Sequence, residues 1–186
     1  MKLTQEIVRE LLDYNPISGR LVWKERDIKW FKHSLKRTQE HTCHHWNSRF
    51  SGKVAGHIGI ENYWLIKLFG KSHKQHRIIW LWMTGEWPEN DIDHKNRNRS
   101  DNRWANLREA TRSQNRMNIT KQVLNSSGYK GVSVCDFGFQ TEIRANGIRE
   151  YIGFSVDPKE AAKMYDKAAI KYHGEFAVTN ESLGLL

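Results

Sequence analysis

The sequence predicts an α+β fold in two parts: a mixed region of helices and short strands over residues 1–118, and a small three-stranded antiparallel sheet with one helix over residues 128–186. Three observations lead to this prediction. A chain of 186 residues holds one ordinary domain or two small ones. Apolar runs of strand length alternate with glycine-containing turns. Residues 119–127 lack an apolar period and run into an Asn-Ser-Ser-Gly sequence, which is typical of a linker.

The first region opens with a predicted helix that Thr4 can cap. Its apolar side chains share one face: Ile7, Val8, Leu11 and Leu12. Asn15-Pro16 should end this helix, because the residue before a proline is pushed out of helical geometry. Residues 21–23 then form a candidate strand. Residues 24–52 are charged and irregular, so we expect a surface loop there.

Further along, residues 63–68 form a predicted strand that ends at Gly70. Residues 78–83 are another apolar run, which residues 85–88 interrupt. The segment from Asp91 to Asn118 is instead dense in Asp, Asn, His and Arg, with few apolar anchors. This composition suits a functional site better than a core.

The second part is predicted to contain three short strands and a closing helix. The strands span residues 130–134, 139–144 and 150–154. Asp157 caps the helix, Pro158 occupies its first position, and Glu160 lies where it can reach back to the cap. The apolar stripe of this helix comprises Ala161, Tyr165, Ala168 and Tyr172. Lysines recur every fourth residue on the opposite face, which most simply makes it a solvated surface.

Composition narrows the class of protein. The chain is 38% hydrophobic and 11% aromatic, which is typical of a folded protein. No run approaches the roughly 20 apolar residues of a membrane span, and the first residues do not resemble a signal peptide. We therefore expect a soluble, cytoplasmic protein with no membrane partner. The two cysteines predict no disulfide framework. A cluster of potential zinc ligands lacks the paired spacing of structural sites: His41, Cys43, His44 and His45.

Positive charge is concentrated in one segment. The whole chain has a net charge of +9 and a pI near 9.6, which favours polyanionic partners. Residues 94–118 carry seven basic residues against two acidic ones, a net charge of +5. Residues 128–186 carry seven basic and eight acidic residues, a net charge of −1. Any contact with nucleic acid in the second part must therefore depend on the local placement of side chains.

Hydrolysis of a phosphodiester needs a base to activate water and a cation to offset negative charge in the transition state. The string from Asp91 to Asn115 contains residues that could supply the base and bind the cation. His94, with an ordinary pKa of about 6.5, can take a proton if an acceptor holds its other ring nitrogen. The side-chain carbonyl of Asn106 could be that acceptor. Asp93 and Asn115 offer hard oxygen ligands for one divalent ion, Mg²⁺ or Mn²⁺.

The same string follows the pattern D-H-(loop)-D-N-R-x-x-N-L-R-x-A-T-x-x-Q-N and resembles the phage-type branch of the HNH endonuclease family. The resemblance implies a ββα-metal nuclease fold with its motif over residues 91–118. It further implies that Asp93 and Asn115 are metal ligands, that His94 is the base and that Asn106 orients it. The third motif position is Asn115 rather than His, and Arg97-Asn98 replaces a common Gly-Asp pair.

The resemblance extends upstream through recurring landmarks at residues 12–19, 53–56, 76–77 and 84–88. His76 either contacts the scissile phosphate or packs against the neighbouring hairpin, and the sequence leaves both alternatives open. Basic side chains of this region are expected to hold the phosphate backbone of double-stranded DNA. They are Arg77, Arg97, Arg99, Arg103, Arg108, Arg112 and Arg116.

Residues 128–182 resemble the plant ethylene-response-factor type of DNA-binding domain, through Tyr129-Lys130-Gly131-Val132, residues 139–144 and 152–154, and the Ala-rich helix. That domain lays its sheet in the major groove, so outward strand side chains would contact DNA. The candidates are Lys130, Ser133, Gln140, Arg144 and Arg149. Alternatively, these strands only complete a small α+β domain.

Together these resemblances imply a metal-dependent DNA endonuclease, site-specific in the manner of homing enzymes. It would act in the cytoplasm, that of a bacterial host if the chain is phage-encoded. One active centre per chain implies nicking by a monomer, whereas a double-strand break needs a homodimer or two sequential events. A structure-specific or repair nuclease is a further alternative. The rival from another class is a non-catalytic DNA-binding regulator on a decayed nuclease fold, although a decayed site would be expected to have lost one of the four motif residues.

Overall fold

The computed structural model describes residues 2–33, 35–118, 126–145 and 147–186. They form two compact units, Met1–Glu109 and Ala110–Leu186. Each combines helices with small antiparallel sheets, so the predicted α+β class is confirmed. The division follows Glu109, earlier than the boundary at residue 118 that the sequence suggested, and most of the predicted linker lies outside the described residues.

Helix α1 (Gln5–Leu11) begins as predicted, with the Thr4 side chain accepting a hydrogen bond from the Ile7 backbone N–H. It ends at Leu11 rather than at Asn15-Pro16. Strand β1 (Leu12–Asn15) follows directly and pairs with β2 (Arg20–Trp23). Burial alternates along β1, with Leu12 and Tyr14 inward, and this period of two is the signature of a strand that the helical interpretation overlooked.

The expectation of an irregular loop over residues 24–52 was wrong. This segment contains a 3-10 turn, η1 (Ile28–Trp30), and the twelve-residue helix α2 (Gln39–Phe50). Thr38 caps α2, yet none of its residues is fully buried. The helix is held by aromatic contacts, with the Trp46 ring 5.5 Å from that of Trp23. Because its apolar contacts come from so few residues, no amphipathic period marks α2 in the sequence.

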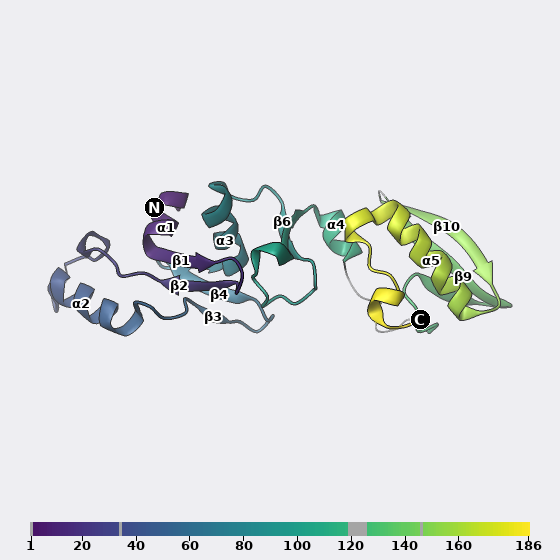
Figure 1. Ribbon diagram of the computed structural model, residues 1–186, viewed down its shortest axis with the longest axis horizontal. Coiled ribbons are helices and arrows are strands. Elements are labelled where there is room, and N and C mark those ends of the chain that lie inside the picture. Colours follow the sequence, from purple (N-terminus) through teal and green to yellow (C-terminus); the bar gives the residue numbers. More distant parts are fainter. Residues whose placement is uncertain (1, 34, 119–125, 146) are drawn as a thin grey trace. The chain divides into compact units, whose positions relative to one another are not determined.

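A meander of three strands follows: β3 (His57–Ile58), β4 (Trp64–Leu68) and β5 (Lys71–Lys74). The predicted strand at residues 63–68 is thereby confirmed. Helix α3 (Gln75–Thr84) starts directly after β5, and Gly85 at φ 89° ends it. Its buried residues Ile78, Ile79 and Leu81 join those of α1, β1, β2 and β4 in one core. The ribbon shows these elements gathered together (Figure 1). That core is the support on which the candidate site rests.

The remaining sheet of the first unit pairs β6 (Asp91–His94) with β7 (Leu107–Ala110), and the 3-10 turn η2 (Trp104–Asn106) leads into β7. Ile92 and Leu107 are buried in the core of the unit. Each strand is therefore anchored by one apolar side chain, while the polar residues of the motif occupy neighbouring positions.

The second unit begins with the short helix α4 (Arg112–Met117). Its sheet has the order β10-β9-β8, from β8 (Val132–Cys135), β9 (Gly138–Ala145) and β10 (Ile148–Ser155). Helix α5 (Pro158–His173) runs along this sheet (Figure 1), and η3 (Gly174–Phe176) and η4 (Glu181–Leu183) follow it. The three predicted strands and the closing helix are confirmed.

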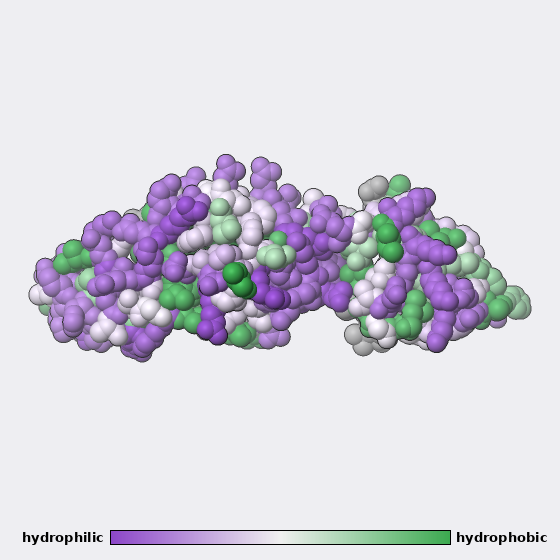
Figure 2. Space-filling view, in the orientation of Figure 1, coloured by the Kyte–Doolittle hydropathy of each residue, from purple (hydrophilic) through white to green (hydrophobic). Residues whose placement is uncertain are grey.

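Hydrophilic side chains cover most of each unit in the face shown (Figure 2). Among the described residues, no helix is both long enough and apolar enough to cross a lipid bilayer.

Candidate active site

Strand β6 ends in two buried polar residues, Asp93 and His94. The His94 side chain belongs to a residue only 3% exposed, and burial lowers its pKa below the ordinary value, partly offset by the contact with Asn102. A neutral imidazole at neutral pH is what a general base requires. The local structure thus keeps His94 in the protonation state that proton abstraction needs.

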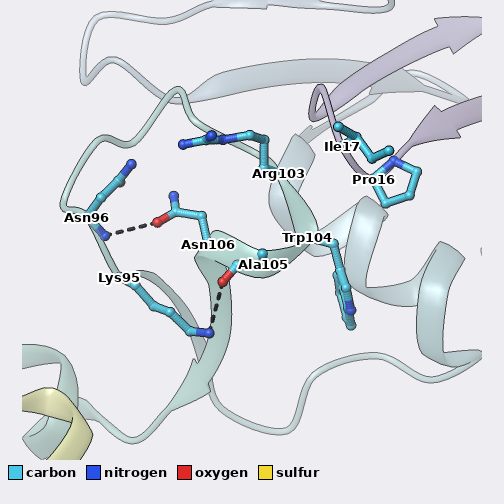
Figure 3. A pocket seen from close by; sticks show the side chains of 8 residues that line it. All are labelled: Pro16, Ile17, Lys95, Asn96, Arg103, Trp104, Ala105 and Asn106. Carbon is cyan, nitrogen blue, oxygen red and sulfur yellow. Dashed lines mark hydrogen bonds between the residues drawn. The ribbon is translucent and has the colours of Figure 1, made fainter.

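Asn106 holds the loop between β6 and β7. Its side-chain oxygen accepts a hydrogen bond from the Asn96 backbone N–H at 3.0 Å (Figure 3). Its amide nitrogen donates to the Asp101 carbonyl at 2.8 Å. The Asn106 carbonyl also accepts from the Lys95 N–H at 2.9 Å. The sequence assigned Asn106 to orienting His94. In the structure its side chain instead closes the loop that follows His94.

The acceptor beside His94 is Asn102. The His94 Nε2 atom lies 3.1 Å from the Asn102 side-chain oxygen. The amide nitrogen of Asn102 donates to the Gln75 side-chain oxygen at 3.0 Å, and the Gln75 amide nitrogen donates to the Ala55 carbonyl at 2.7 Å. A continuous buried chain of polar groups therefore joins His94 to the backbone of the first unit.

The His94 ring also packs against the rings of His76 and Tyr63. His76 packs edge-on against His94 at 5.1 Å and against Tyr63 at 5.3 Å between ring centroids. Burial lowers the pKa of His76 to about 3, with the nearby His94 and Lys74 acting in the same direction. His76 thus packs against neighbouring rings in the structure, and its contact with the scissile phosphate stays a prediction.

The carboxylate of Asp93 is fixed by Arg108. Both Nε and Nη2 of Arg108 lie 2.9 Å from Asp93 Oδ2, and both side chains are almost fully buried. Arg108 was expected to hold the DNA backbone, but in the structure its guanidinium forms an ion pair with Asp93. The pairing is understandable, since a buried carboxylate is costly unless a charge and hydrogen bonds compensate it.

The other predicted arginines of the first unit divide by their contacts. Arg77 donates to the backbone carbonyls of Asn90 and Pro88, and Arg103 pairs with Asp101 at 2.6 Å. Arg99 lies over the Tyr63 ring, 5.0 Å from its centroid. Arg97 is exposed in the loop, and so are Arg112 and Arg116 of α4 in the second unit. Arg97, Arg112 and Arg116 are therefore accessible to solvent, whereas the guanidinium of Arg77 stabilises the fold through its backbone contacts.

A groove lies beside the motif loop, between residues 95–106 and the β1–β2 turn at Pro16 and Ile17 (Figure 3). The turn approaches the loop closely, because the Trp104 N–H donates to the Pro16 carbonyl at 3.1 Å. Gly19, at φ 72°, lies so near that a Cβ would come within 2.5 Å of the Arg103 nitrogen. The first hairpin of the chain therefore supports the loop that carries the motif.

No group of three or more His, Cys, Asp or Glu side chains in the described part of the chain could hold a metal ion. In the α2 cluster, His41 and His45 stack at 6.5 Å, while the Cys43 thiol contacts the Arg26 carbonyl at 3.4 Å. Of the two predicted metal ligands, Asp93 belongs to the first unit. Asn115 lies on α4 in the second unit and is half-buried.

In the second unit, the sheet turns one face to α5 and leaves the other open. Thr141 is buried and its hydroxyl donates to the Ala161 carbonyl of α5 at 2.9 Å. Residues between the buried positions of β9 face the other way. The strand register places Ser133 opposite Gln140 and Arg144 opposite Arg149 on that open face. Lys130 precedes β8, and its ammonium group donates to the Met117 carbonyl.

Sequence reasoning missed three residues around His94: Gln75, Asn102 and Tyr63. Asn102 stands inside the motif string, and this position was a signal, although it did not reveal the partner. Gln75 lies 27 residues before Asn102 and carries no signal of its own. Tyr63 precedes a strand and resembles any aromatic residue of a sheet.

Fold and site together define a class: two antiparallel strands present a buried Asp-His pair on a loop closed by an asparagine, in a basic segment. Residues 73–117 match a family model described as HNH endonuclease. The chain is 30% identical over 131 residues to an uncharacterized HNH endonuclease of Acanthamoeba polyphaga mimivirus, covering 69% of this chain and 68% of the relative. The chain belongs to the HNH endonuclease family. No solved structure matches it significantly.

Proposed function

We propose that the chain is a metal-dependent endonuclease that hydrolyses phosphodiester bonds of double-stranded DNA, with His94 as general base. The observation that carries this proposal is the burial of a neutral His94 next to Asp93 at the end of β6, held by Asn102. In the proposed reaction, His94 accepts a proton from water as the water oxygen attacks phosphorus and the 3′ oxygen departs.

One divalent metal ion, Mg²⁺ or Mn²⁺, is part of the proposal. The proposed ligands are a carboxylate from Asp93 and an amide oxygen from Asn115, the hard donors that Mg²⁺ prefers. Arg108 supports this role for Asp93, because its guanidinium compensates the buried carboxylate and holds it in one orientation. A bound ion would supply positive charge that stabilises the transition state. Arg97, Arg112 and Arg116 are exposed and would hold the DNA backbone.

The second unit is proposed to select the site in the manner of an ethylene-response-factor domain and of homing enzymes. Its open sheet face carries the side chains of Ser133, Gln140, Arg144 and Arg149. Exposed aromatic residues accompany them, with Tyr151 63% and Phe154 43% exposed. Arginine and glutamine are suited to the donor and acceptor pattern of base edges, and apolar groups can contact thymine methyls. This placement favours recognition over a purely structural sheet.

A plasmid-nicking assay with Mg²⁺ or Mn²⁺ tests the proposal. We expect the wild-type chain to nick supercoiled DNA and His94→Ala to lose activity by roughly a hundredfold to ten-thousandfold, because a positioned base contributes that much. The exposed His44→Ala in α2 is the matched control and should cut normally. Equal activity in wild type and His94→Ala would refute the assignment of the base.

The same assay separates the alternatives. A wild-type chain that binds DNA but never cuts it, with either metal, would favour the non-catalytic regulator. Sequencing the cut ends distinguishes a defined site from a structure-specific nuclease that cuts at many sequences. The ratio of nicked to linear plasmid over time, measured at several protein concentrations, reports whether a monomer nicks or a homodimer breaks both strands.

A further inference from the structure

The polar chain behind His94 runs through two amides whose orientation can be worked out from its far end. Gln75 and Asn102 are 2% and 3% exposed, so their amide groups have little access to water. Each amide presents a donor on one side and an acceptor on the other. In such a chain, a fixed partner at one end determines the direction of every hydrogen bond that follows.

The fixed partner is the backbone carbonyl of Ala55, which can only accept. The Gln75 group that lies 2.7 Å from it must therefore be the amide nitrogen. The Gln75 oxygen then faces Asn102, whose amide nitrogen donates to it at 3.0 Å. This leaves the Asn102 oxygen facing His94 Nε2 at 3.1 Å. An oxygen acceptor at that distance requires a proton on Nε2.

We propose that Gln75 and Asn102 are positioning residues that select one tautomer of His94, with the proton on Nε2 and the lone pair on Nδ1. The atom that accepts the proton from water in the proposed reaction is then Nδ1. The hydrogen bond at one nitrogen decides which nitrogen is basic. This inference rests on the proposed function only for the role of Nδ1, because the tautomer itself follows from the contacts.

This chain of hydrogen bonds from Ala55 through Gln75 and Asn102 to His94, here called the relay, also explains why a glutamine stands at the start of α3. Gln75 is the first residue of that helix, and Ala55 lies in the segment before β3. The helix and the segment belong to the core of the first unit, so the amide of Gln75 links the imidazole to rigid structure. Tyr14 supports the same asparagine differently, since its hydroxyl donates to the Asn102 backbone carbonyl at 2.7 Å.

Nuclear magnetic resonance of the full chain labelled with ¹⁵N-histidine tests the tautomer without any activity. Long-range couplings from the ring protons distinguish a protonated from an unprotonated ring nitrogen. We expect His94, assigned by comparison with His94→Gln, to show a protonated Nε2 and an unprotonated Nδ1. A proton on Nδ1 in the wild-type chain would overturn the proposal.

Variants then test the roles of the two amides. Gln75→Met preserves side-chain length but leaves the Asn102 amide free to turn, so we expect a mixture of tautomers and a kcat lowered on the order of tenfold to a hundredfold at unchanged KM. Adding Asn102→Asp should restore the Nε2–H tautomer, because either oxygen of a carboxylate accepts. Gln39→Met is the matched control, because it removes a glutamine contact to a backbone carbonyl away from the site, that of Phe31, and should leave the tautomer and kcat unchanged.

The outcomes separate this inference from the proposed function. A folded Gln75→Met with wild-type tautomer and kcat would overturn the positioning role. If that variant does not fold, the tautomer of the wild-type chain still decides the direction of the hydrogen bonds between Gln75, Asn102 and His94. A protonated Nε2 in a wild-type chain that never cuts DNA would support the relay while the proposed nuclease function fails.

Discussion

The two units place their polar residues in opposite ways. In the first unit, His94, Asp93 and Asn106 are buried, and each is held by hydrogen bonds that span the loop or the core. In the second unit, Arg144 and Arg149 lie on an open sheet face. Chemistry benefits from groups fixed before the substrate arrives, whereas contacts to DNA form on an accessible surface. The comparison separates a centre for reaction from a surface for recognition.

Buried polar groups also occur in the second unit, but there they connect segments of the fold. Asn180 is fully buried, and its amide nitrogen donates to the Asp166 carboxylate at 2.9 Å and to the Lys130 carbonyl at 3.1 Å. These contacts tie the segment after α5 to the segment before β8. Burial alone therefore does not identify a catalytic group. His94 of the first unit differs because it lies in the motif, beside the carboxylate of Asp93.

Within this comparison of the two units, the largest effect is expected from Asp93→Asn, measured beside Asp101→Asn. Both carboxylates pair with an arginine, but the Asp93 pair is buried and the Arg103 partner of Asp101 is exposed. Losing the proposed metal ligand should lower nicking roughly a thousandfold, since such an ion contributes several kcal/mol. Asp101→Asn should cost less than tenfold, because exposed ion pairs contribute little.

Stability must be controlled in this comparison, because Asp93→Asn leaves the Arg108 cation buried without its charged partner. Asp93→Asn combined with Arg108→Gln removes both charges and should recover the thermal midpoint without recovering nicking. Recovery of nicking in the double variant would show that Asp93 is needed only to compensate Arg108.

A smaller effect is expected from Arg144→Ala with Arg149→Ala on the open sheet face. A base contact is worth about 1–3 kcal/mol, so each arginine that reads a base should contribute roughly tenfold or more to affinity. The rate at saturating DNA should stay unchanged. Selection from a randomised duplex library, followed by anisotropy titrations at fixed salt, measures both affinity and sequence preference.

Lys167→Ala is the control for this prediction, because Lys167 is exposed on α5, which covers the other face of the sheet. Its loss should lower affinity little and leave the selected sequence unchanged. If Lys167→Ala weakens binding as much as the two arginine substitutions together, DNA contacts the helix side and the proposed reading face is wrong.

The sequence predicted the parts of this molecule whose signals are local. Turn glycines and alternating side chains indicated β8, β9 and β10, and Asp157-Pro158 marked the start of α5. The motif string located Asp93 and His94. Helix α2 escaped detection because its packing depends on aromatic contacts such as Trp46 with Trp23, which lie far apart in sequence.

What the sequence could not provide was the partner of each polar group. A basic residue near the motif suggests a contact with DNA, and only burial shows that Arg108 serves Asp93. Asn102 replaces Asn106 as the partner of His94 because the loop geometry, set by Asn106 itself, brings Asn102 to the imidazole. Such contacts follow from tertiary structure and not from spacing along the chain.

The smallest predicted effect concerns stability against acid in the first unit. The pKa of His76 is lowered to about 3 by burial, while an unfolded chain has an ordinary histidine pKa near 6.5. Between these values the unfolded state binds the additional proton, so stability falls as the pH falls below about 6.5. From pH 7 to pH 5, linkage gives a loss of roughly 2 kcal/mol from His76, and the lowered pKa of His94 acts in the same direction.

Urea titrations followed by tryptophan fluorescence measure this loss in the right unit, because all eight tryptophans lie between Trp23 and Trp104. His76→Phe keeps an aromatic ring against Tyr63 but cannot titrate, so its unfolding free energy should fall roughly 2 kcal/mol less over the same pH range. An identical pH dependence in the wild type and in His76→Phe would contradict the lowered pKa of His76, because His76 would then bind its proton in the folded chain.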